Sequence, residues 1–348
     1  MRRRTGGRTL TNQAETKDPA PGPAEGLVQK RRKRAGRVAW AVSDFKIALT
    51  LAVQLLPAWI LPESWWAPLW RATARVPRLI ASPRAIRRTG KSIAAALGDV
   101  DMGRARAIAR DLKAAVYEIR FQDLRAWRPR LNPRGSWTPK LSLEGEAHLI
   151  AALQGNKGAV LWVSPTVFNS LPTKMALHAK GYKVSHLSSP GHGYSETRFG
   201  VDVLNRVRCI PEDRYIAQRI VFDREAPTTA MRRMMRALKS GEVVSIVAAN
   251  TEGFEMVSGP IFGGLLPVAV GAPRLAALTG APLLPTFVVR DPELGFRIVI
   301  EPPIPLDPKQ PADERTVAAA TEYLRRSEAW VRGYPEQWRG WSKWRPRA

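Results

Sequence analysis

Thiols and nucleotide-binding motifs are scarce in this chain of 348 residues. The single cysteine, Cys209, excludes an internal disulfide and a cysteine-based metal cluster. The sequence has neither a Gly-x-Gly-x-x-Gly fingerprint nor a phosphate-binding loop, so the common nucleotide sites are not indicated. It also lacks a serine in Gly-x-Ser-x-Gly, the turn that presents the nucleophile of α/β hydrolases. We therefore expect no cofactor and no metal.

Acidic residues are few relative to basic ones. The chain has 55 Lys and Arg against 30 Asp and Glu, a formal net charge of +25 at pH 7. The excess is concentrated in residues 1–46 and 71–140. Such blocks favour an anionic partner, such as a phospholipid surface, an acidic carrier protein or nucleic acid. Nucleic acid is the least supported partner, because aromatic residues are not interleaved with the basic runs as a stacking surface requires. A solvated, Arg-rich surface is the alternative.

The longest apolar stretch lies between these two basic blocks. Residues 47–61 contain only Thr50 and Gln54 as polar side chains. A helix of this length spans about 22 Å, whereas the hydrocarbon core of a bilayer is about 30 Å thick. Because Asp44 and Lys46 precede the stretch and Glu63 follows it, we expect an interfacial or re-entrant anchor rather than a spanning helix.

Tryptophan is abundant, and many of the 12 residues lie near the two ends of the chain. Its ring prefers the interface between membrane and water, where the apolar surface is buried and the N–H stays solvated. Near the C-terminus, Trp338, Trp341 and Trp344 are expected either to dock on the core or to dip into lipid.

The chain divides by composition into four segments. Residues 1–36 are predicted to be a disordered basic tail, 37–70 a membrane-associating anchor, 71–140 a helical basic segment and 141–348 an α/β domain. In the last segment, strands are predicted at 141–143, 158–164, 182–187, 242–248, 283–290 and 295–301, and helices at 145–154, 170–180, 195–205, 212–222, 228–239, 268–279 and 312–332. This alternation predicts an α/β fold with a mostly parallel sheet and helices on both faces, preceded by an N-terminal membrane-associating helix.

Four passages of the α/β segment carry a resemblance to a known family. They are residues 143–164 (LEGEAHLI, then GAVLWVS), 238–244 (LKSGEVV), 260–282 (PIFGG, GAPRLA and TGAP) and 334–338 (YPEQW), the last followed by Trp341 and Arg345. In order and spacing they resemble the lysophospholipid acyltransferase superfamily, most closely the lipid A lauroyl and myristoyl acyltransferases. The resemblance implies transfer of a fatty acyl chain from a thioester of acyl carrier protein or coenzyme A to a lipid or amphiphilic acceptor. It also implies a peripheral or monotopic location on the cytoplasmic face of a bacterial inner membrane.

The catalytic motif of that family is missing from this sequence. In the family, a His oriented by an acid five positions later takes a proton from the acceptor hydroxyl. The matching positions here are Thr166 and Leu171, and no Asp or Glu occurs between Glu146 and Glu196. A threonine cannot act as a base near pH 7, so catalysis of the family type needs a replacement. Thr166 and Asn169 are expected to contact the substrate.

His192 is the candidate replacement for the base. It follows a predicted strand within a Gly-rich loop (residues 188–200), at the edge where parallel α/β proteins place their sites. If a helix begins there, Glu196 shares a face with His192 and can orient its ring. The alternatives are that this region binds the acceptor, or that it is a capping loop in which Glu196 and Arg198 are surface charges.

Basic residues after this loop are candidates for binding the acceptor's phosphates. They are Arg198, Arg206 and Arg208, because a guanidinium binds phosphate in a bidentate manner. The alternative is that they solvate a helix and form ion pairs with Glu212 and Asp213.

The sequence leaves two functions open. The first is a membrane-associated acyltransferase in which His192, with Glu196, is a relocated base. The second is a catalytically inactive relative that acts as a membrane-associated lipid-binding or scaffold protein. The missing motif favours the second function, and the Gly-rich loop suits either.

Overall fold

A computed structural model describes residues 25–29, 38–76, 78–127, 137–189, 191–222, 227–249 and 255–347. Most of the predicted basic tail lies outside these residues. One part of the tail is described, because β1 (Glu25–Gln29) pairs antiparallel with β7 (Glu255–Ile261). The prediction of disorder for the rest of the tail falls on residues outside the described ones.

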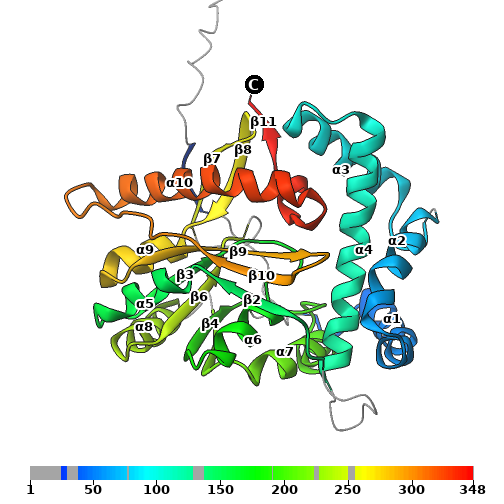
Figure 1. Ribbon diagram of the computed structural model, residues 1–348, viewed down its shortest axis with the longest axis horizontal. Helices are drawn as coiled ribbons and strands as arrows, with labels where there is room; N and C mark the ends of the chain where they lie inside the picture. Colours follow the sequence, from blue (N-terminus) through cyan, green and yellow to red (C-terminus); the bar gives the residue numbers. More distant parts are fainter. Residues whose placement is uncertain are drawn as a thin grey trace, which may run out of the picture.

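The centre of the molecule is a seven-stranded, mostly parallel sheet (Figure 1). Its strands, in spatial order, are β2 (Leu141–Glu144), β10 (Gly295–Ile300), β9 (Leu283–Asp291), β3 (Ala159–Val163), β6 (Val243–Val247), β4 (Val184–Ser188) and β5 (Gln218–Val221). Within this described sheet, only the pair of β9 and β10 is antiparallel. Every residue of β3 is buried, as in a central strand covered on both faces. The predicted α/β class and mostly parallel sheet are confirmed.

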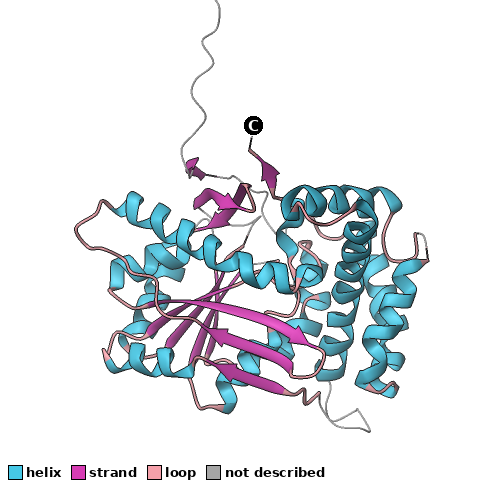
Figure 2. Ribbon diagram, turned by 45° about the horizontal axis from the view of Figure 1, so that its top comes forward, coloured by secondary structure: helices cyan, strands magenta, loops and turns pink. Residues whose placement is uncertain are grey.

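Helices lie above and below this sheet (Figure 2). They are α5 (Glu146–Gln154), α6 (Leu171–Ala179), α7 (Arg206–Asp213), α8 (Pro227–Lys239), α9 (Gly271–Thr279) and α10 (Ala312–Gly333). Five of these match predicted helices closely. The sixth, α7, does not, and only the short π-helix η3 (Gly200–Leu204) forms in the predicted helix at 195–205.

The predicted helix at 212–222 is wrong. There α7 ends at Asp213, and the chain continues into β5, which pairs in parallel with β4. Backbone pairing at the edge of a sheet decides the conformation of this short segment, and local periodicity does not report such pairing. A second sheet, in the order β1, β7, β8 (Gly264–Ala269) and β11 (Arg345–Pro346), is also absent from the prediction.

In the described part of the chain, four α-helices precede the α/β unit. They are α1 (Val42–Ile60), α2 (Trp66–Arg75), α3 (Pro83–Leu97) and α4 (Met102–Trp127). Helix α4 packs against the other three and also against α7, and Figure 1 shows it between the sheet and the α1–α2 pair. One cluster of buried apolar residues runs from α1 to the C-terminal segment. The four helices therefore share the hydrophobic core of the α/β unit.

The predicted anchor corresponds to α1, but this helix is longer than predicted. Asp44 and Lys46 lie inside the helix instead of blocking it. The Asp44 carboxylate accepts a hydrogen bond from the backbone N–H of Ala41 (2.8 Å), which satisfies a donor at the helix start. By length and composition alone, α1 is the one described helix that could cross a membrane.

One face of α1 is fixed to α4. Leu51, Gln54 and Ala58 are buried on this face. At the C-terminal end, Arg125 of α4 donates from Nε to the Ala58 carbonyl (2.6 Å) and from Nη2 to the Leu61 carbonyl (2.7 Å). In this structure α1 therefore lies along the protein with one side covered by it.

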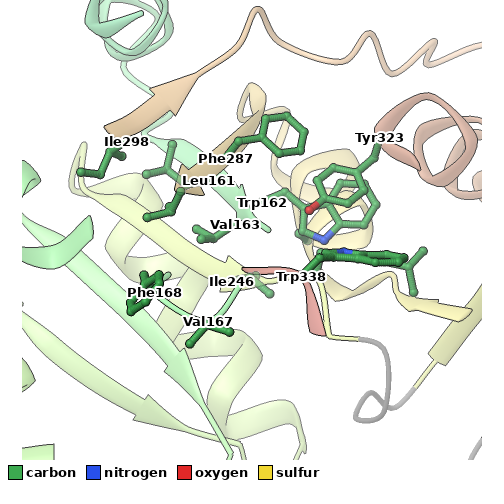
Figure 3. Packing of buried hydrophobic residues seen from close by; sticks show 14 of the residues in the cluster. Leu161, Trp162, Val163, Val167, Phe168, Ile246, Phe287, Ile298, Tyr323 and Trp338 are labelled. Atoms are coloured by element: carbon green, nitrogen blue, oxygen red, sulfur yellow. The ribbon is translucent and has the colours of Figure 1, made fainter. Parts of the chain in front are cut away.

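The C-terminal tryptophans dock on the core. Trp338, Trp341 and Trp344 are each at most 4% exposed. Figure 3 shows Trp338 close to Trp162 of β3 and Tyr323 of α10. The ring centroids of Trp162 and Tyr323 are 4.3 Å apart. Of the two alternatives that the sequence left open, the structure selects packing on the core.

Gly158 allows two backbones to approach where β3 begins. Its φ is +63°, and a methyl group here would lie 2.5 Å from the Glu242 carbonyl oxygen and 2.9 Å from the Leu238 Cα. Gly241 has a similar φ of +74° but no atom within 4 Å of that position.

We expect Gly241→Ala to lower the free energy of unfolding by about 1–2 kcal/mol, the cost of the left-handed conformation, and Gly158→Ala by roughly 3 kcal/mol or more. Urea denaturation of both variants measures the difference. Equal losses would show that the neighbouring backbone gives way freely.

Candidate functional site

The loop that follows β3 contains Thr166 and Asn169, which the sequence predicts to contact the substrate. The Thr166 hydroxyl donates a hydrogen bond to the Val288 carbonyl (2.6 Å), and the residue is 6% exposed. The Asn169 amide donates to the Ser164 carbonyl (2.8 Å). The cavity beside Thr166 has a volume of about 20 Å³, enough for about one water molecule. In this structure both side chains bind backbone carbonyls, and their contact with a substrate stays a prediction.

A buried carboxylate, Glu212 of α7, organises the polar residues beneath this loop. It accepts hydrogen bonds from Ser170 Oγ (2.5 Å), Lys174 Nζ (2.8 Å), Arg219 Nη2 (2.8 Å) and His192 Nε2 (2.9 Å). The Glu212 side chain is 0% exposed and that of Lys174 3%. We call these five residues the Glu212 cluster. It ties α6, the Gly-rich loop, α7 and β5 together through one charge.

The carboxylate that binds the His192 ring is thus Glu212, and not the predicted Glu196. The pairing with Glu196 assumed that a helix begins at His192, which would place the two residues one turn apart. The chain from 192 to 197 is not helical, and Glu196 is exposed. The predicted geometry of this pair is therefore wrong, because the loop turns the two side chains differently from a helix.

The charges in the Glu212 cluster shift the pKa values of its members. Burial by itself raises the pKa of Glu212, but Lys174 and His192 outweigh it and hold that pKa well below its usual range. Burial lowers the pKa of His192, although Glu212 acts in the opposite direction. Burial, with Lys174 adding to it, also lowers the pKa of the neighbouring His186. Burial therefore disfavours the charged form of both imidazoles.

A larger space, of about 350 Å³, opens between α4, the Gly-rich loop and the C-terminal segment. Lys113 and Arg120 of α4, Arg208 of α7 and Arg339 of η5 (Arg339–Ser342) line it, and we call it the cationic cleft. Its apolar lining comes from Leu112, Val116, Ile119 and Trp341, and the loop contributes Gly193 and Tyr194. Among the described residues that line it, none carries a carboxylate.

One of the four cations is neutralised by a buried acid. Arg208 donates to Asp123 of α4 from Nε (3.0 Å) and Nη2 (2.9 Å), and the Tyr194 hydroxyl donates to the same carboxylate oxygen (2.5 Å). In the part of the chain that the structure describes, Lys113, Arg120 and Arg339 form no ion pair with a carboxylate. The cleft therefore carries an excess of positive charge.

Two of the three unneutralised cations of the cleft have lowered pKa values. Desolvation of the guanidinium by the protein around it, together with Arg208, lowers the pKa of Arg339 to about 10, although the residue as a whole is exposed. Burial, together with Arg88 and Arg339, lowers the pKa of Lys113. An anion in the cleft would relieve both effects, because it restores the favourable interactions that the cations lose with water. Phosphate and carboxylate groups are the anions that Arg and Lys bind most often in proteins.

The cationic cleft adjoins the loop after β3. The Arg339 backbone N–H donates to the Pro165 carbonyl (3.3 Å), and its Nη2 donates to the Val167 carbonyl (3.3 Å). Ligand sites in open α/β sheets lie outside the carboxyl ends of parallel strands. The cleft therefore occupies the place where this fold positions a ligand, although Thr166 itself does not line it.

Of the three arginines predicted to bind phosphate, Arg208 alone lines the cationic cleft. Arg206 is exposed, and Arg198, with its side chain 79% exposed, lies 3.9 Å from Asp202. Sequence reasoning missed Lys113, Arg120 and Arg339. For the first two a signal was present, since residues seven apart share a face of a helix. Arg339 comes from the other end of the chain, and only the tertiary structure brings it to α4.

Residues 203–343 match the family described as bacterial lipid A biosynthesis acyltransferase. The match includes Arg208, Glu212, Arg219 and Arg339, and it begins after the segment that contains Thr166 and His192. It supports an acyltransferase-like function. No curated protein matches the chain.

The buried imidazoles make stability depend on pH in a defined direction. Because His186 and His192 have pKa values below that of an unfolded histidine, about 6.5, protons bind preferentially to the unfolded chain. The contribution of these two histidines to the free energy of unfolding is fully present above pH 6.5. It is lost as the pH falls below 6.5, by up to about 1.4 kcal/mol per pH unit for each group. We expect His186→Gln to reduce this loss between pH 7.5 and 5.5, and His178→Gln, at an exposed site, to leave it unchanged. Urea denaturation at each pH gives the slopes. Identical slopes in all three proteins would contradict the expectation.

Proposed function

We propose that this is an acyltransferase-like protein that binds an anionic amphiphile at the cytoplasmic face of a bacterial inner membrane. The observation that carries the proposal is the cationic cleft, in which Lys113, Arg120 and Arg339 have no carboxylate partner among the described residues. The apolar side of the cleft, formed by residues such as Val116 and Ile119, suits an acyl chain or lipid backbone. A phosphorylated lipid satisfies both kinds of lining.

Binding is the part of this function that the geometry supports best. No histidine is among the described residues that line the cleft. The Thr166 hydroxyl is engaged with a backbone carbonyl, and burial, together with Asp123, raises the pKa of Tyr194 well above its usual range. Neither group can remove a proton from an acceptor hydroxyl near pH 7.

Acyl transfer is the second candidate, and the match over residues 203–343 favours it. The acyl donor would be a thioester of acyl carrier protein or coenzyme A. His192 would be the base, and because it does not line the cleft, its ring would have to leave the hydrogen bond to Glu212 to reach a ligand there. Binding needs no such rearrangement.

The cleft cations are expected to determine the affinity for phosphorylated lipid. Lys113→Met and Arg120→Met each remove one charged hydrogen-bond donor, worth about 1.5–3 kcal/mol, so each should weaken binding of dihexanoyl phosphatidate roughly 10–100-fold. Isothermal titration calorimetry on the purified protein measures the dissociation constants. Lys239→Met, at an exposed position on α8, is the matched control and should bind as the wild type does. Equal affinity for phosphatidate and dihexanoyl glycerol would show that the cleft does not read the phosphate.

A transfer assay separates the two candidate functions. Wild type and His192→Gln are incubated with labelled acyl-acyl carrier protein, labelled acyl-coenzyme A and vesicles of bacterial lipid. From the geometry we expect no labelled lipid that depends on His192. A product that appears with the wild type and is lost in the variant would establish acyl transfer and replace binding as the function. Far-ultraviolet circular dichroism shows whether the variant is folded.

A further inference from the structure

Lys113 of α4 is a half-buried lysine in the wall of the cationic cleft. Among the described residues it forms no ion pair with a carboxylate. A lysine withdrawn from water normally gains such a partner, as Lys174 gains Glu212 in this structure (2.8 Å). The amine of Lys113 is therefore left for a ligand of the cleft.

The charged side chains that act on Lys113 from the packed elements are cations. Helix α3 packs against both α4 and η5, and it brings Arg88 toward Lys113, while η5 brings Arg339. Burial, with Arg88 and then Arg339 adding to it, lowers the pKa of Lys113. More of this amine is therefore neutral near pH 8 than of an ordinary lysine, whose pKa is about 10.4. A neutral amine beside other cations is the usual form of a nucleophilic lysine.

The other titratable groups of the cleft leave this amine without a counter-ion. Arg208 and Tyr194 both donate to Asp123, so that buried carboxylate is already shared. Arg120, which lies two turns from Lys113 on the same face of α4, stacks over the Tyr117 ring at 4.4 Å from its centroid. Each of these groups faces the cleft or its wall with its own partner or with positive charge.

The apolar lining of the cleft begins beside Lys113. Leu112 precedes it and Val116 lies one turn further along α4, and both line the same space of about 350 Å³. Sites for small molecules have volumes of about 300–1,000 Å³. An electrophile that suits this site carries an apolar chain for the wall, anionic groups for the cations and a reactive carbon between them. A fatty acyl thioester of coenzyme A has all three.

We propose that Lys113 is a self-acylation site, whose amine takes a fatty acyl group from a thioester bound in the cationic cleft. The neutral Nζ attacks the thioester carbonyl carbon and a C–N bond forms. The C–S bond then breaks, and the departing thiolate takes up the proton that the amine releases. The products are an amide on Lys113 and a free thiol, and no further reactant is needed. The neighbouring cations favour the negative charge that develops on the carbonyl oxygen.

Acylation of Lys113 changes the cleft permanently. An amide is a much poorer acyl donor than a thioester, so the reaction ends after one acyl group per chain. The modification removes one of the three unneutralised charges and lays a chain along the apolar wall. This inference rests on the proposed function, because the cleft must admit an anionic amphiphile.

Mass spectrometry of the protein after incubation with lauroyl-coenzyme A tests the site. We expect one lauroyl group per chain on Lys113, added at least about tenfold faster than on Lys91, an exposed lysine of α3. Hydroxylamine cleaves thioesters but not amides, so a label that survives it lies on a lysine and not on Cys209. The thioester of lauric acid with N-acetylcysteamine keeps the chain but lacks the phosphates, and it should label Lys113 at least about tenfold more slowly.

Three variants separate a reactive amine from a structural role. Lys113→Arg keeps the charge and removes the nucleophile, so it should abolish the label, whereas the matched control Lys91→Arg should keep it. Arg88→Met removes a neighbouring cation and so raises the pKa of Lys113. Labelling of Arg88→Met should therefore fall about threefold or more at pH 7 and approach that of the wild type at pH 9.5. A loss that is equal at both pH values would contradict the role of Arg88.

Two results would overturn the site. One is equal labelling of Lys113 and Lys91 in the wild type, and the other is equal labelling of Lys113 by the two thioesters. Failure of the proposed function gives a different result. A wild type that binds dihexanoyl phosphatidate but is not labelled refutes self-acylation alone. A wild type that is labelled on Lys113 but does not bind phosphatidate refutes the phosphorylated lipid as the ligand of the cleft and leaves Lys113 as the site.

Discussion

The arrangement of the candidate site depends on the buried charge of Glu212. A carboxylate without solvent exposure is tolerated only when hydrogen bonds and opposite charges replace water, and Lys174 and Arg219 supply both. Removing it would leave the buried Lys174 without a carboxylate partner, a cost of roughly 3–5 kcal/mol, whereas Arg219 would keep its ion pair with Asp213. Because Glu212 lies on α7, the same interactions fix the position of Arg208, one turn earlier in that helix.

This polar network lies beneath the loop that follows β3. The loop after β3 directs its polar groups inward, with Ser170 bound to Glu212 and Thr166 bound to a carbonyl of β9. His192 is the imidazole nearest in role to the missing base, and its ring is held by the same carboxylate. These side chains are hydrogen-bonded within the protein, and the positive charge without a carboxylate partner lies in the neighbouring cleft.

The N-terminal helices make the cleft possible. Without α4 the loop at 193–194 and the segment at 339–342 would have no third wall and no Lys113 or Arg120 beside them. Helix α1 in turn covers one side of α4 with Leu51 and Ala58. The opposite side of α1 is not covered by the protein. Helix α1 therefore packs one apolar face against the interior and presents a second apolar face outward.

The sequence by itself determined the α/β class, the central strands and most of the helices. A short continuous apolar run such as residues 159–163, between Gly158 and Pro165, is typical of a central strand covered on both faces, because its length and flanking residues argue against a buried helix. It could not determine β5, whose conformation comes from pairing with β4, nor the ends of α1, where Asp44 acts through hydrogen bonds to a loop about 150 residues away. It suggested Arg208 but not Arg339, and it paired His192 with the wrong acid. Those contacts join residues that are distant along the chain, and only the packing of α4, α7 and the C-terminal segment on the sheet decided which charges meet.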